Sequence, residues 1–566
     1  MNFQSIILLS VILAIAAIVA YRYIRRQKRG GGCGSCNCNC NCNNMCKAVI
    51  LALITLTTQG TIAQQPALIP YPRKIYLSKT KPCIIKNDLL ISASDDLANE
   101  AAWLKTLLSQ RCKATISHSN KTDITLRIDS CLTGDREQYT LSVAHRGITV
   151  SGASPHAVFN GINTLYQWIL ANSTAVKHGI SISPVEIQDT PRYSYRALML
   201  DPARHFLPIP AIKRYIDEMA RYKFNVLQLH LADDQGFRVQ ILTHPRLTEG
   251  QQHYTQDEIR DLVTYAATRH IAIVPEIDIP GHTYAILRNY PQSLCQHIDT
   301  TAWGQRLRTD VMLCASAPSV YNLCIDILSE IATLFPAPYI HMGGDESLIS
   351  KNWGQCPRCQ ALKAQLGYTS DDQIMGYFFS HFWDMLRAKG KKPILWIEMD
   401  NIRPPATRYL FPYPQDVTLV TWRNALTPKA VQLTAASGNQ LIMAPGEHCY
   451  FDYPQYKGDL PETNNWGMPI LTLQDSYQWD PGYPQLNQPH QHIIGVMGTL
   501  WGEAINDINR AFYMTYPRAL ALAEAGWSTH DNRQWDSFKT RIYSILYDQM
   551  HRGIPFRVPF EIQNSK

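Results

Sequence analysis

The chain has 566 residues, of which 45% are hydrophobic and 17% are charged. A chain of this length and composition can bury more than one hydrophobic core, which excludes a wholly disordered protein and a small disulfide-stabilised domain. The net charge of +7 comes mainly from six basic residues within residues 1–47, which contain no acidic residue. Because the rest of the chain is nearly neutral, it offers no extended basic face, and we expect no nucleic-acid partner.

Residues 1–63 are predicted to direct export rather than to form part of a catalytic domain. The uncharged apolar run from residue 6 to residue 20 precedes a basic cluster at residues 22–29, as in a membrane segment with a cytoplasmic basic flank. A second apolar stretch, residues 48–57, ends shortly before Ala63 and resembles a signal peptide cleaved near that residue. The sequence therefore predicts an exported protein, periplasmic or at the cell surface, with a membrane tether if the first segment is retained.

Six cysteines lie between these two apolar stretches, in a tract rich in glycine and asparagine (residues 33–46). The tract could bind a soft metal ion through thiolates, or it could be a low-complexity tail without a fixed number of ligands. Residues 1–42 resemble the small cysteine-rich membrane proteins associated with bacterial ferrous-iron transport. Met45 would be a natural start for a separate exported protein. The N-terminal region is therefore either a fused or over-extended reading frame or the tether of the exported part.

Residues 64–187 are predicted to form a small α+β domain. Apolar residues from Leu97 to Leu108 recur at helical spacing, whereas residues 139–143 and 147–151 alternate as two strands around a turn. The polar residues of this segment show no convergent pattern. We therefore expect the domain to have a packing or scaffold role.

From about residue 188 the chain alternates between buried strands and helices. Helices are predicted where apolar residues recur every three to four positions, as from Ile212 to Met219, and after a capping box from Thr255 to Glu258. The predicted strands are residues 197–200, 225–231, 271–277, 338–342, 393–397, 417–422, 440–444 and 494–500. Eight such strands favour a (β/α)8 TIM barrel of the α/β class over residues 188–528, followed by a helical extension over residues 529–566.

Polar residues stand just past the end of every predicted strand, which is where the active site of a (β/α)8 barrel forms. In chain order they are Asp201, Arg204, Asp233, Asp234, Asp278, His282, Asp345, Glu346, Glu398, Arg423, Tyr450, Asp452 and Glu503. Three tryptophans, Trp396, Trp422 and Trp501, also lie at strand ends. Because all eight ends carry such residues, we expect them to converge on one rim of the barrel.

These residues indicate no metal site. His230, His282 and His341 lie on three different strands without the paired spacing of a zinc site, so we interpret them as hydrogen-bonding partners. Cys356 and Cys359 form a CxxC pair, but no second CxxC exists in the part predicted to be exported. A local disulfide or simple packing is therefore favoured over half of a four-cysteine zinc site. The HMGGDE segment also lacks the residues of a phosphate-binding loop.

The remaining pattern is a cleft rich in carboxylates and tryptophans, which favours a carbohydrate. An indole ring can stack on the C–H face of a sugar while charged side chains bind its hydroxyl groups. Asp345 and Glu346 are the clearest catalytic pair, because two adjacent carboxylates at a buried strand end are costly to desolvate without a function. Adjacent residues are too close to lie on opposite sides of a sugar ring. One should therefore be the general acid, and the other should act differently.

Seven motifs follow one another along the chain. They are RALMLDPARHF from Arg196, LADDQGF from Leu231, PEIDIPGH from Pro275, HMGGDE from His341, YFD from Tyr450, YQWDP from Tyr477 and LWGE from Leu500. Together, over about residues 66–528, they resemble glycoside hydrolase family 20, the β-N-acetylhexosaminidases. The resemblance implies an exo-acting enzyme that removes terminal GlcNAc or GalNAc without a cofactor. It also implies retention through an oxazolinium intermediate, formed when the acetamido oxygen of the substrate attacks C1.

The resemblance further implies a role for each site residue. Glu346 would protonate the leaving oxygen and later activate water, and we expect it to be buried near aromatic rings. Asp345 would hold the acetamido N–H, and Tyr450 would hydrogen-bond the carbonyl oxygen. Trp396, Trp422 and Trp501 would wall the acetamido pocket, with Trp479 beside it. The hydroxyl groups of the sugar would be bound by Arg204, Asp452 and Glu503. A supporting network around Glu346 would consist of Asp233, Asp278 and His282.

Two alternatives remain open on the sequence alone. A related enzyme that releases a disaccharide, such as a lacto-N-biosidase, would need a wider cleft around Asp452 and Glu503. A non-catalytic glycan-binding barrel is the other alternative, and the intact pair of Asp345 and Glu346 argues against it. The sequence does not indicate the natural glycan or the oligomeric state.

Overall fold

A computed structural model describes residues 65–109, 113–116, 122–301, 306–459, 467–484 and 491–562. The predicted membrane segment, cysteine tract and signal segment all lie outside these ranges. Gln65–Lys566 form one compact unit. Within the described ranges, no helix is long and apolar enough to cross a membrane.

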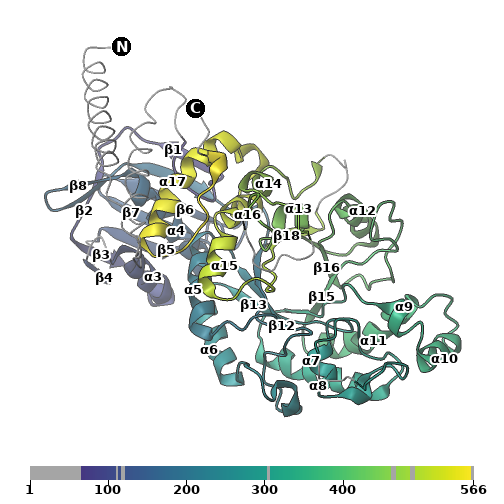
Figure 1. The fold of residues 1–566 in the computed structure, drawn as a ribbon. Coiled ribbons are helices and arrows are strands. Elements are labelled where there is room, and N and C mark those ends of the chain that lie inside the picture. Colours follow the sequence, from purple (N-terminus) through teal and green to yellow (C-terminus); the bar gives the residue numbers. More distant parts are fainter. Residues whose placement is uncertain are drawn as a thin grey trace, which may run out of the picture. The chain divides into compact units, whose positions relative to one another are not determined.

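The N-terminal part of this unit is built on a mixed seven-stranded sheet and a small three-stranded sheet (Figure 1). The strands are β1 (Lys74–Leu77), β2 (Cys83–Lys86), β3 (Asp88–Ser92), β4 (Lys113–Ile116), β5 (Ile124–Ile128), β6 (Tyr139–Ala144), β7 (Gly147–Gly152), β8 (Ser173–Val176), β9 (Gly179–Ile182) and β10 (Val185–Asp189). The large sheet has the order β1-β10-β6-β7-β5-β3-β4, and the small sheet has the order β2-β9-β8. β6 and β7 pair antiparallel, which confirms the predicted hairpin.

Two helices, α3 (Ala98–Leu108) and α4 (Pro155–Asn172), complete this part. The predicted apolar face from Leu97 to Leu108 is buried in the hydrophobic core. α4 begins at a Ser154 cap, whose hydroxyl accepts the Ala157 N–H, and it packs against β5, β6 and β7. The predicted small α+β domain is therefore confirmed.

The following strands close into a barrel in which every neighbouring pair is parallel. They are β11 (Tyr195–Leu200), β12 (Val226–Ala232), β13 (Ala272–Ile277), β14 (Tyr339–His341), β15 (Lys392–Trp396), β16 (Thr418–Thr421), β17 (Leu441–Met443) and β18 (Ile493–Gly498). All eight predicted strands are found, each within a few residues of its expected bounds. Alternate residues such as Ala197 and Met199 form a core inside the barrel, whereas Leu198 and Leu200 belong to the core outside it.

Helices follow the strands around the barrel, as Figure 1 shows. They are α5 (Ile209–Arg221), α6 (Gln256–Ala267), α7 (Tyr284–Leu287), α8 (Pro318–Leu334), α9 (Ile349–Asn352), α10 (Pro357–Gln365), α11 (Gln373–Ala388), α12 (Thr427–Ser437), α13 (Gly446–Cys449), α14 (Leu473–Tyr477), α15 (Ile508–Thr515), α16 (Arg518–Trp527) and α17 (Trp535–His551). α6 begins with the predicted capping box between Thr255 and Glu258. The predicted (β/α)8 barrel is thus confirmed.

A buried ion pair joins the small domain to the barrel. Asp189, at the end of β10, accepts hydrogen bonds from the Tyr139 hydroxyl (2.6 Å) and from the indole N–H of Trp527 on α16 (2.9 Å). The ammonium group of Lys223, which follows α5, lies 3.1 Å from the same carboxylate. Because Asp189 and Lys223 are both almost fully buried, this pair holds the two parts together away from water.

Candidate active site

The predicted catalytic pair lies in a glycine-dependent loop directly after β14. Gly343 and Gly344 have φ angles of 67° and 93°, and Glu346 has a φ of 46°. A Cβ atom at Gly343 would lie 1.7 Å from Asp278 Oδ1, so only glycine fits at this position. The Gly344 N–H donates to the same oxygen over 3.2 Å. The loop is therefore folded against Asp278, and this fold sets the direction of Asp345 and Glu346.

His282 brings the two carboxylates of the pair together. Its Nε2 atom lies 4.0 Å from Asp345 Oδ2 and 3.7 Å from Glu346 Oε2. Its Nδ1 atom lies 3.3 Å from Asp233 Oδ1. Since one imidazole nitrogen is close to both carboxylates, the side chains of Asp345 and Glu346 face a common region, as the catalytic interpretation requires.

Burial and neighbouring charges determine the ionisation of this cluster. Burial alone would lower the pKa of His282, but the carboxylates of Asp233 and Asp345 raise it to about 10. His282 is therefore an imidazolium ion at neutral pH. Burial raises the pKa of Asp345, although the charge of His282 opposes this shift. Burial, together with the Asp345 carboxylate, raises the pKa of Asp278 well above its usual range, so we expect Asp278 to carry a proton.

Asp345 and Glu346 differ in their exposure. Asp345 is 6% exposed, and its carboxyl group is hydrogen-bonded to that of Asp278. The Glu346 side chain is 54% exposed, and the Glu346 backbone N–H donates to Glu398 Oε1 over 3.3 Å. The prediction that Glu346 is buried near aromatic rings is therefore wrong, because Asp345 and His282 occupy the buried side of the loop.

Two of the predicted tryptophans pair at the end of the barrel. The ring centroids of Trp396 and Trp501 are 5.8 Å apart, and Trp396 Nε1 donates to Glu276 Oε1 over 2.8 Å. Tyr450 lies beside Trp501, with 6.4 Å between their ring centroids. Burial raises the pKa of Tyr450 well above its usual range, and the Asp345 carboxylate contributes to the shift. Its hydroxyl group therefore stays protonated and can donate a hydrogen bond.

The other two predicted tryptophans have different surroundings. Trp422 packs against the barrel-end cluster that contains Trp396, and the guanidinium of Arg423 lies 3.9 Å from the centre of its ring. Trp479 stacks on His448, with 5.1 Å between the ring centroids and an interplanar angle of 3°. These contacts connect Trp422 to the predicted indole wall, but they do not connect Trp479 to it.

Arg204 is held by two carboxylates. One of its terminal nitrogens lies 2.9 Å from Asp201 Oδ2, and the other lies 2.8 Å from Asp233 Oδ2. Its guanidinium also lies 5.0 Å from the centre of the Trp501 ring. Because Asp233 also contacts His282, Arg204 is connected to the catalytic loop through this shared carboxylate.

Asp452 and Glu503 lie at neighbouring strand ends. The Trp501 N–H donates to Asp452 Oδ1 over 3.5 Å. Burial and the charge of Glu503 raise the pKa of Asp452 well above its usual range. Glu503 itself is exposed, and its charge helps to raise the pKa of Arg204 against the effect of burial. Arg204, Asp452 and Glu503 are therefore close enough to influence one another's ionisation.

Family models match nearly the whole of the described part. The model described as "Glycosyl hydrolase family 20, catalytic domain" matches residues 193–530, more than half of the chain. The chain belongs to glycosyl hydrolase family 20. The model described as "Glycosyl hydrolase family 20, domain 2" matches residues 65–190. The resemblance carried by the seven sequence motifs is thus confirmed.

Relatives in this family cover most of the chain. A "Beta-hexosaminidase" of Akkermansia muciniphila is 33% identical over 429 residues, which are 72% of this chain and 83% of the relative. A "Beta-hexosaminidase" of Porphyromonas gingivalis is 30% identical and covers 91% of this chain and 68% of the relative. The crystal structure of a GH20 exo-β-N-acetylglucosaminidase from Vibrio harveyi, in complex with N-acetylglucosamine, has a TM-score of 0.76 at 29% identity. It covers 89% of this chain and 80% of the Vibrio chain.

Glu398 and Arg423 belong to the site of this family 20 protein, although no role was predicted for either residue. Arg423 Nη2 lies 2.9 Å from Glu398 Oε1, which also accepts the Glu346 N–H. Burial raises the pKa of Glu398 to about 7, although Arg423 opposes the shift and Asp345 adds to it. Both residues follow barrel strands, and this position had already placed them among the residues predicted to converge on the rim.

A second buried network lies beneath the family 20 site. Glu276 lies between two histidines, with 3.0 Å from its Oε2 to His230 Nδ1 and 3.2 Å from its Oε1 to His341 Nδ1. His230 Nε2 also lies 2.7 Å from Asp233 Oδ2. The interpretation of these histidines as polar partners is therefore consistent with their contacts. Glu276 was missed because it lies within β13 rather than after it.

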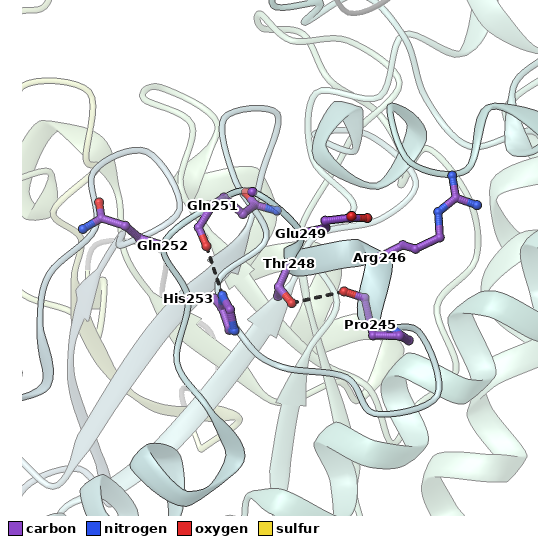
Figure 2. Close-up of a pocket in the computed structure, with 8 residues that line it drawn as sticks. Pro245, Arg246, Thr248, Glu249, Gln251, Gln252 and His253 are labelled. Carbon is purple, nitrogen blue, oxygen red and sulfur yellow. Dashed lines mark hydrogen bonds between the residues drawn. The ribbon is translucent and has the colours of Figure 1, made fainter.

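A surface pocket separate from the strand-end residues is lined by Pro245, Arg246 and residues 248–253, as Figure 2 shows. Its polar contacts are local, such as His253 Nδ1 with the Gln251 carbonyl oxygen at 3.0 Å and the Thr248 hydroxyl with the Pro245 carbonyl oxygen at 3.4 Å. None of the predicted site residues lines this pocket. We therefore base the function on the strand-end residues.

The CxxC pair has neighbours that its spacing does not reveal. Cys356 and Cys359 are free thiols, and Cys295 and Cys314 lie next to them. The local disulfide, one of the two favoured interpretations, is therefore wrong, and two cysteines from another loop adjoin the pair. A second CxxC is not needed when a long loop brings single cysteines into contact.

Proposed function

We propose that this family 20 protein is an exo-acting β-N-acetylhexosaminidase, which hydrolyses terminal, non-reducing GlcNAc or GalNAc residues of glycans. The activities in the printed names of its relatives, β-hexosaminidase and exo-β-N-acetylglucosaminidase, support this proposal. The arrangement of Asp345, Glu346 and Tyr450 beside paired indole rings supports it independently.

In the first step of the proposed reaction, the acetamido carbonyl oxygen of the bound sugar attacks C1. The bond from C1 to the leaving oxygen breaks, and the Glu346 carboxyl group donates its proton to that oxygen. The Asp345 carboxylate accepts the acetamido N–H and offsets the positive charge of the oxazolinium ring as it forms. The Tyr450 hydroxyl donates to the carbonyl oxygen and keeps it directed at C1.

In the second step, water attacks C1 and opens the oxazolinium ring. The Glu346 carboxylate, which lost its proton in the first step, takes a proton from this water molecule. The acetamido group is restored, and two successive inversions at C1 retain the anomeric configuration. The 54% exposure of the Glu346 side chain leaves it accessible both to the leaving group and to water.

The observation that carries the proposal is the pair of adjacent carboxyl groups after β14, one buried and one exposed. Asp345 is 6% exposed, whereas the Glu346 side chain is 54% exposed. The buried carboxylate can accept the substrate N–H, and the exposed carboxyl group is accessible to the leaving oxygen. Asp345 cannot act as a nucleophile on the opposite face from Glu346, because the two residues are adjacent.

The residues at the far end of the proposed sugar site are Arg204, Asp452 and Glu503. Their polar groups would bind the hydroxyl groups of the terminal sugar and close the site beyond it. Arg204 is held by Asp201 and Asp233, so it would present a fixed donor to the substrate. A site closed at this end admits only the terminal residue of a glycan.

We also propose that residues 64–566 act outside the cytoplasm, in the periplasm or at the cell surface, and that the first segment is a membrane tether where it is retained. The apolar stretch that ends near Ala63 supports export. Mass spectrometry of the mature N-terminus would test this. A start near residue 64 would support cleavage of the signal segment, and a start at Met1 would support a tether.

The test of the activity is hydrolysis of an aryl β-N-acetylglucosaminide by the full chain. We expect the wild-type protein to release the aryl group and Glu346→Gln to lose most of this activity, because the amide cannot donate the proton. Glu186→Gln, on an exposed position of β10, is the control and should keep full activity. Binding of sugar without turnover by the wild-type protein would contradict the proposal and favour a glycan-binding barrel.

The disaccharide-releasing alternative is tested with the same protein. We expect the monosaccharide aryl glycoside to be cleaved at least tenfold faster than the aryl glycoside of lacto-N-biose. The opposite order would assign the chain to the disaccharide-releasing enzymes.

A further inference from the structure

Four buried cysteines meet beside the active-site loops. Cys295 follows a short 3₁₀ helix, η3 (Pro291–Ser293), and Cys314 lies in the loop before α8. Cys356 is the N-cap residue of α10, and Cys359 lies in the first turn of that helix. All four side chains are at most 2% exposed. Their four Sγ atoms all lie within 4.8 Å of one another.

The spacing of the sulfur atoms distinguishes a metal site from a disulfide. Cys314 Sγ and Cys359 Sγ are 3.6 Å apart, whereas bonded sulfurs would be about 2.0 Å apart. Four sulfurs arranged tetrahedrally about zinc, each about 2.3 Å from the ion, are about 3.8 Å from one another. The observed separation is therefore close to the edge of a zinc tetrahedron.

The composition of the cluster also fits a mononuclear metal. It contains four thiols and no carboxylate or imidazole ligand, and a tetrahedral set of four sulfurs is typical of zinc or of iron. The Ser316 hydroxyl oxygen lies 3.2 Å from Cys314 Sγ and 3.4 Å from Cys359 Sγ. This hydroxyl can donate to a thiolate and so stabilise the charged ligand set.

We propose that Cys295, Cys314, Cys356 and Cys359 bind one structural Zn²⁺ ion. On binding, each thiol loses its proton to solvent, and the four thiolates form four bonds to the ion, with no change in oxidation state. All four positions around the metal are filled by the protein, so the ion has no open site for substrate and serves the fold rather than the hydrolysis.

The metal ion would connect the two loops that contain the catalytic residues, because each loop provides two of its ligands. The loop from β13 to α8 contains Asp278 and His282 as well as the first two cysteines. The segment from β14 to α10 contains Asp345 and Glu346 and ends at the CxxC pair. A common ion would therefore fix the distance between the carboxylate pair and the imidazole that faces it.

Other contacts between the same loops surround the cluster. Trp353 Nε1 donates to the Leu313 carbonyl oxygen over 2.8 Å, immediately before Cys314. The Leu313 N–H in turn donates to the Pro280 carbonyl oxygen over 3.0 Å, two residues before His282. Lys351 Nζ donates to Asp310 Oδ2 over 2.7 Å. The cluster thus lies in a continuous set of contacts that leads to the catalytic pair.

The test measures metal content in the full chain. Because the cysteine tract of residues 33–46 could bind zinc itself, its six cysteines are replaced by serine in the background protein. We expect about one zinc per chain in this background and none when Cys356→Ser and Cys359→Ser are added. Cys324→Ser, a buried free thiol on α8, is the matched control and should retain the metal.

Two outcomes of the metal analysis would overturn the proposal. One is a background protein without metal, in which mass spectrometry of an unreduced digest finds disulfides among the four cysteines. The other is equal metal content with and without the CxxC pair. Iron in place of zinc would overturn the choice of metal.

A second measurement does not depend on the folding of a variant. The background protein is treated with a chelator, and the thiols that react with an aromatic disulfide reagent are counted before and after. We expect four additional reactive thiols after chelation, and renewed protection when zinc is added back. Addition of Co²⁺ to the stripped protein should give the visible absorption bands of a tetrahedral thiolate site. An unchanged thiol count would contradict the proposal.

Discussion

His282 lies within 4.0 Å of both carboxylates of the catalytic pair, and the carboxylates of Asp233 and Asp345 keep its imidazole protonated. It lies between Asp233 on one side and the carboxylates of Asp345 and Glu346 on the other. An imidazolium at this position limits the repulsion between acidic groups that are crowded around the loop. We therefore interpret His282 as a positioning residue whose charge allows several carboxylates to share one small region.

The raised pKa of His282 predicts a pH-dependent contribution to stability. The pKa is about 10 in the folded protein and about 6.5 in an unfolded chain. The contribution is therefore fully present below pH 6.5 and is lost as the pH rises towards 10. We expect the difference in unfolding free energy between the wild-type protein and His282→Gln to shrink over this range. The change should be a few kcal/mol, because one pKa unit corresponds to about 1.4 kcal/mol.

Urea unfolding of both proteins at pH 6 and at pH 10 would measure this difference. His551→Gln, at the exposed end of α17, is the control and should show no such trend. A stability difference that stays constant or grows towards pH 10 would show that His282 is not charged in the folded state.

At the scale of elements, the loop after β14 depends on glycine at one position. A side chain at Gly343 would displace the Asp278 carboxylate, whose Oδ1 atom would lie 1.7 Å from the new Cβ. We expect Gly343→Ala to lower kcat/KM at least about 100-fold, because a displacement of about 1 Å in a catalytic group has an effect of this size. Aryl glycoside hydrolysis by the folded variant measures this.

Gly367 provides a matched control for this prediction. Its φ of 68° is nearly that of Gly343, but a Cβ atom there would meet no atom within 4 Å. Gly367→Ala should therefore lose about 1 kcal/mol of stability through backbone strain and keep its activity. Equal losses of activity in the two variants would show that strain alone, and not the displacement of Asp278, explains the effect.

A second prediction concerns the contact between the small domain and the barrel. Asp189→Ala would leave the Lys223 ammonium group buried without its counter-ion and would remove the hydrogen bonds from Tyr139 and Trp527, together with two from backbone N–H groups. We expect a loss of about 3–5 kcal/mol in the free energy of unfolding, as is typical when one partner of a buried ion pair is removed. Equilibrium urea unfolding would measure it.

Asp536→Ala is the control for this contact. Asp536 forms an ion pair with Lys539, but its side chain is 93% exposed, so its removal should cost no more than about 0.5 kcal/mol. A cost below 1 kcal/mol for Asp189→Ala would mean that the ion pair does not hold the small domain on the barrel.

The barrel could be predicted because each of its strands and helices has a sequence pattern within its own residues. Each strand is a short apolar run, and each helix has apolar residues at regular spacing or a capping box. Because all parallel barrel strands end at the same rim, residues such as Asp345 and Tyr450 could be grouped without knowing any distance. Most residues of the catalytic cluster could therefore be grouped from the sequence, because they follow barrel strands.

Three features could not be predicted in this way, because each depends on how loops fold. The outward direction of Glu346 follows from backbone angles in the loop after β14. The surroundings of Trp479 depend on its contact with His448 on α13. The four-cysteine cluster requires two loops to meet, and no local spacing connects Cys295 with Cys359.

In the proposed reaction, the nucleophile at C1 is the substrate's own acetamido oxygen. A series of aryl glycosides whose acetamido methyl group carries zero, one, two or three fluorine atoms tests this step. Fluorine withdraws electrons from the carbonyl oxygen and makes it a weaker nucleophile. We predict that kcat/KM falls steeply with each fluorine added. A kcat/KM that is the same across the series would show that another group attacks C1 and would contradict the account.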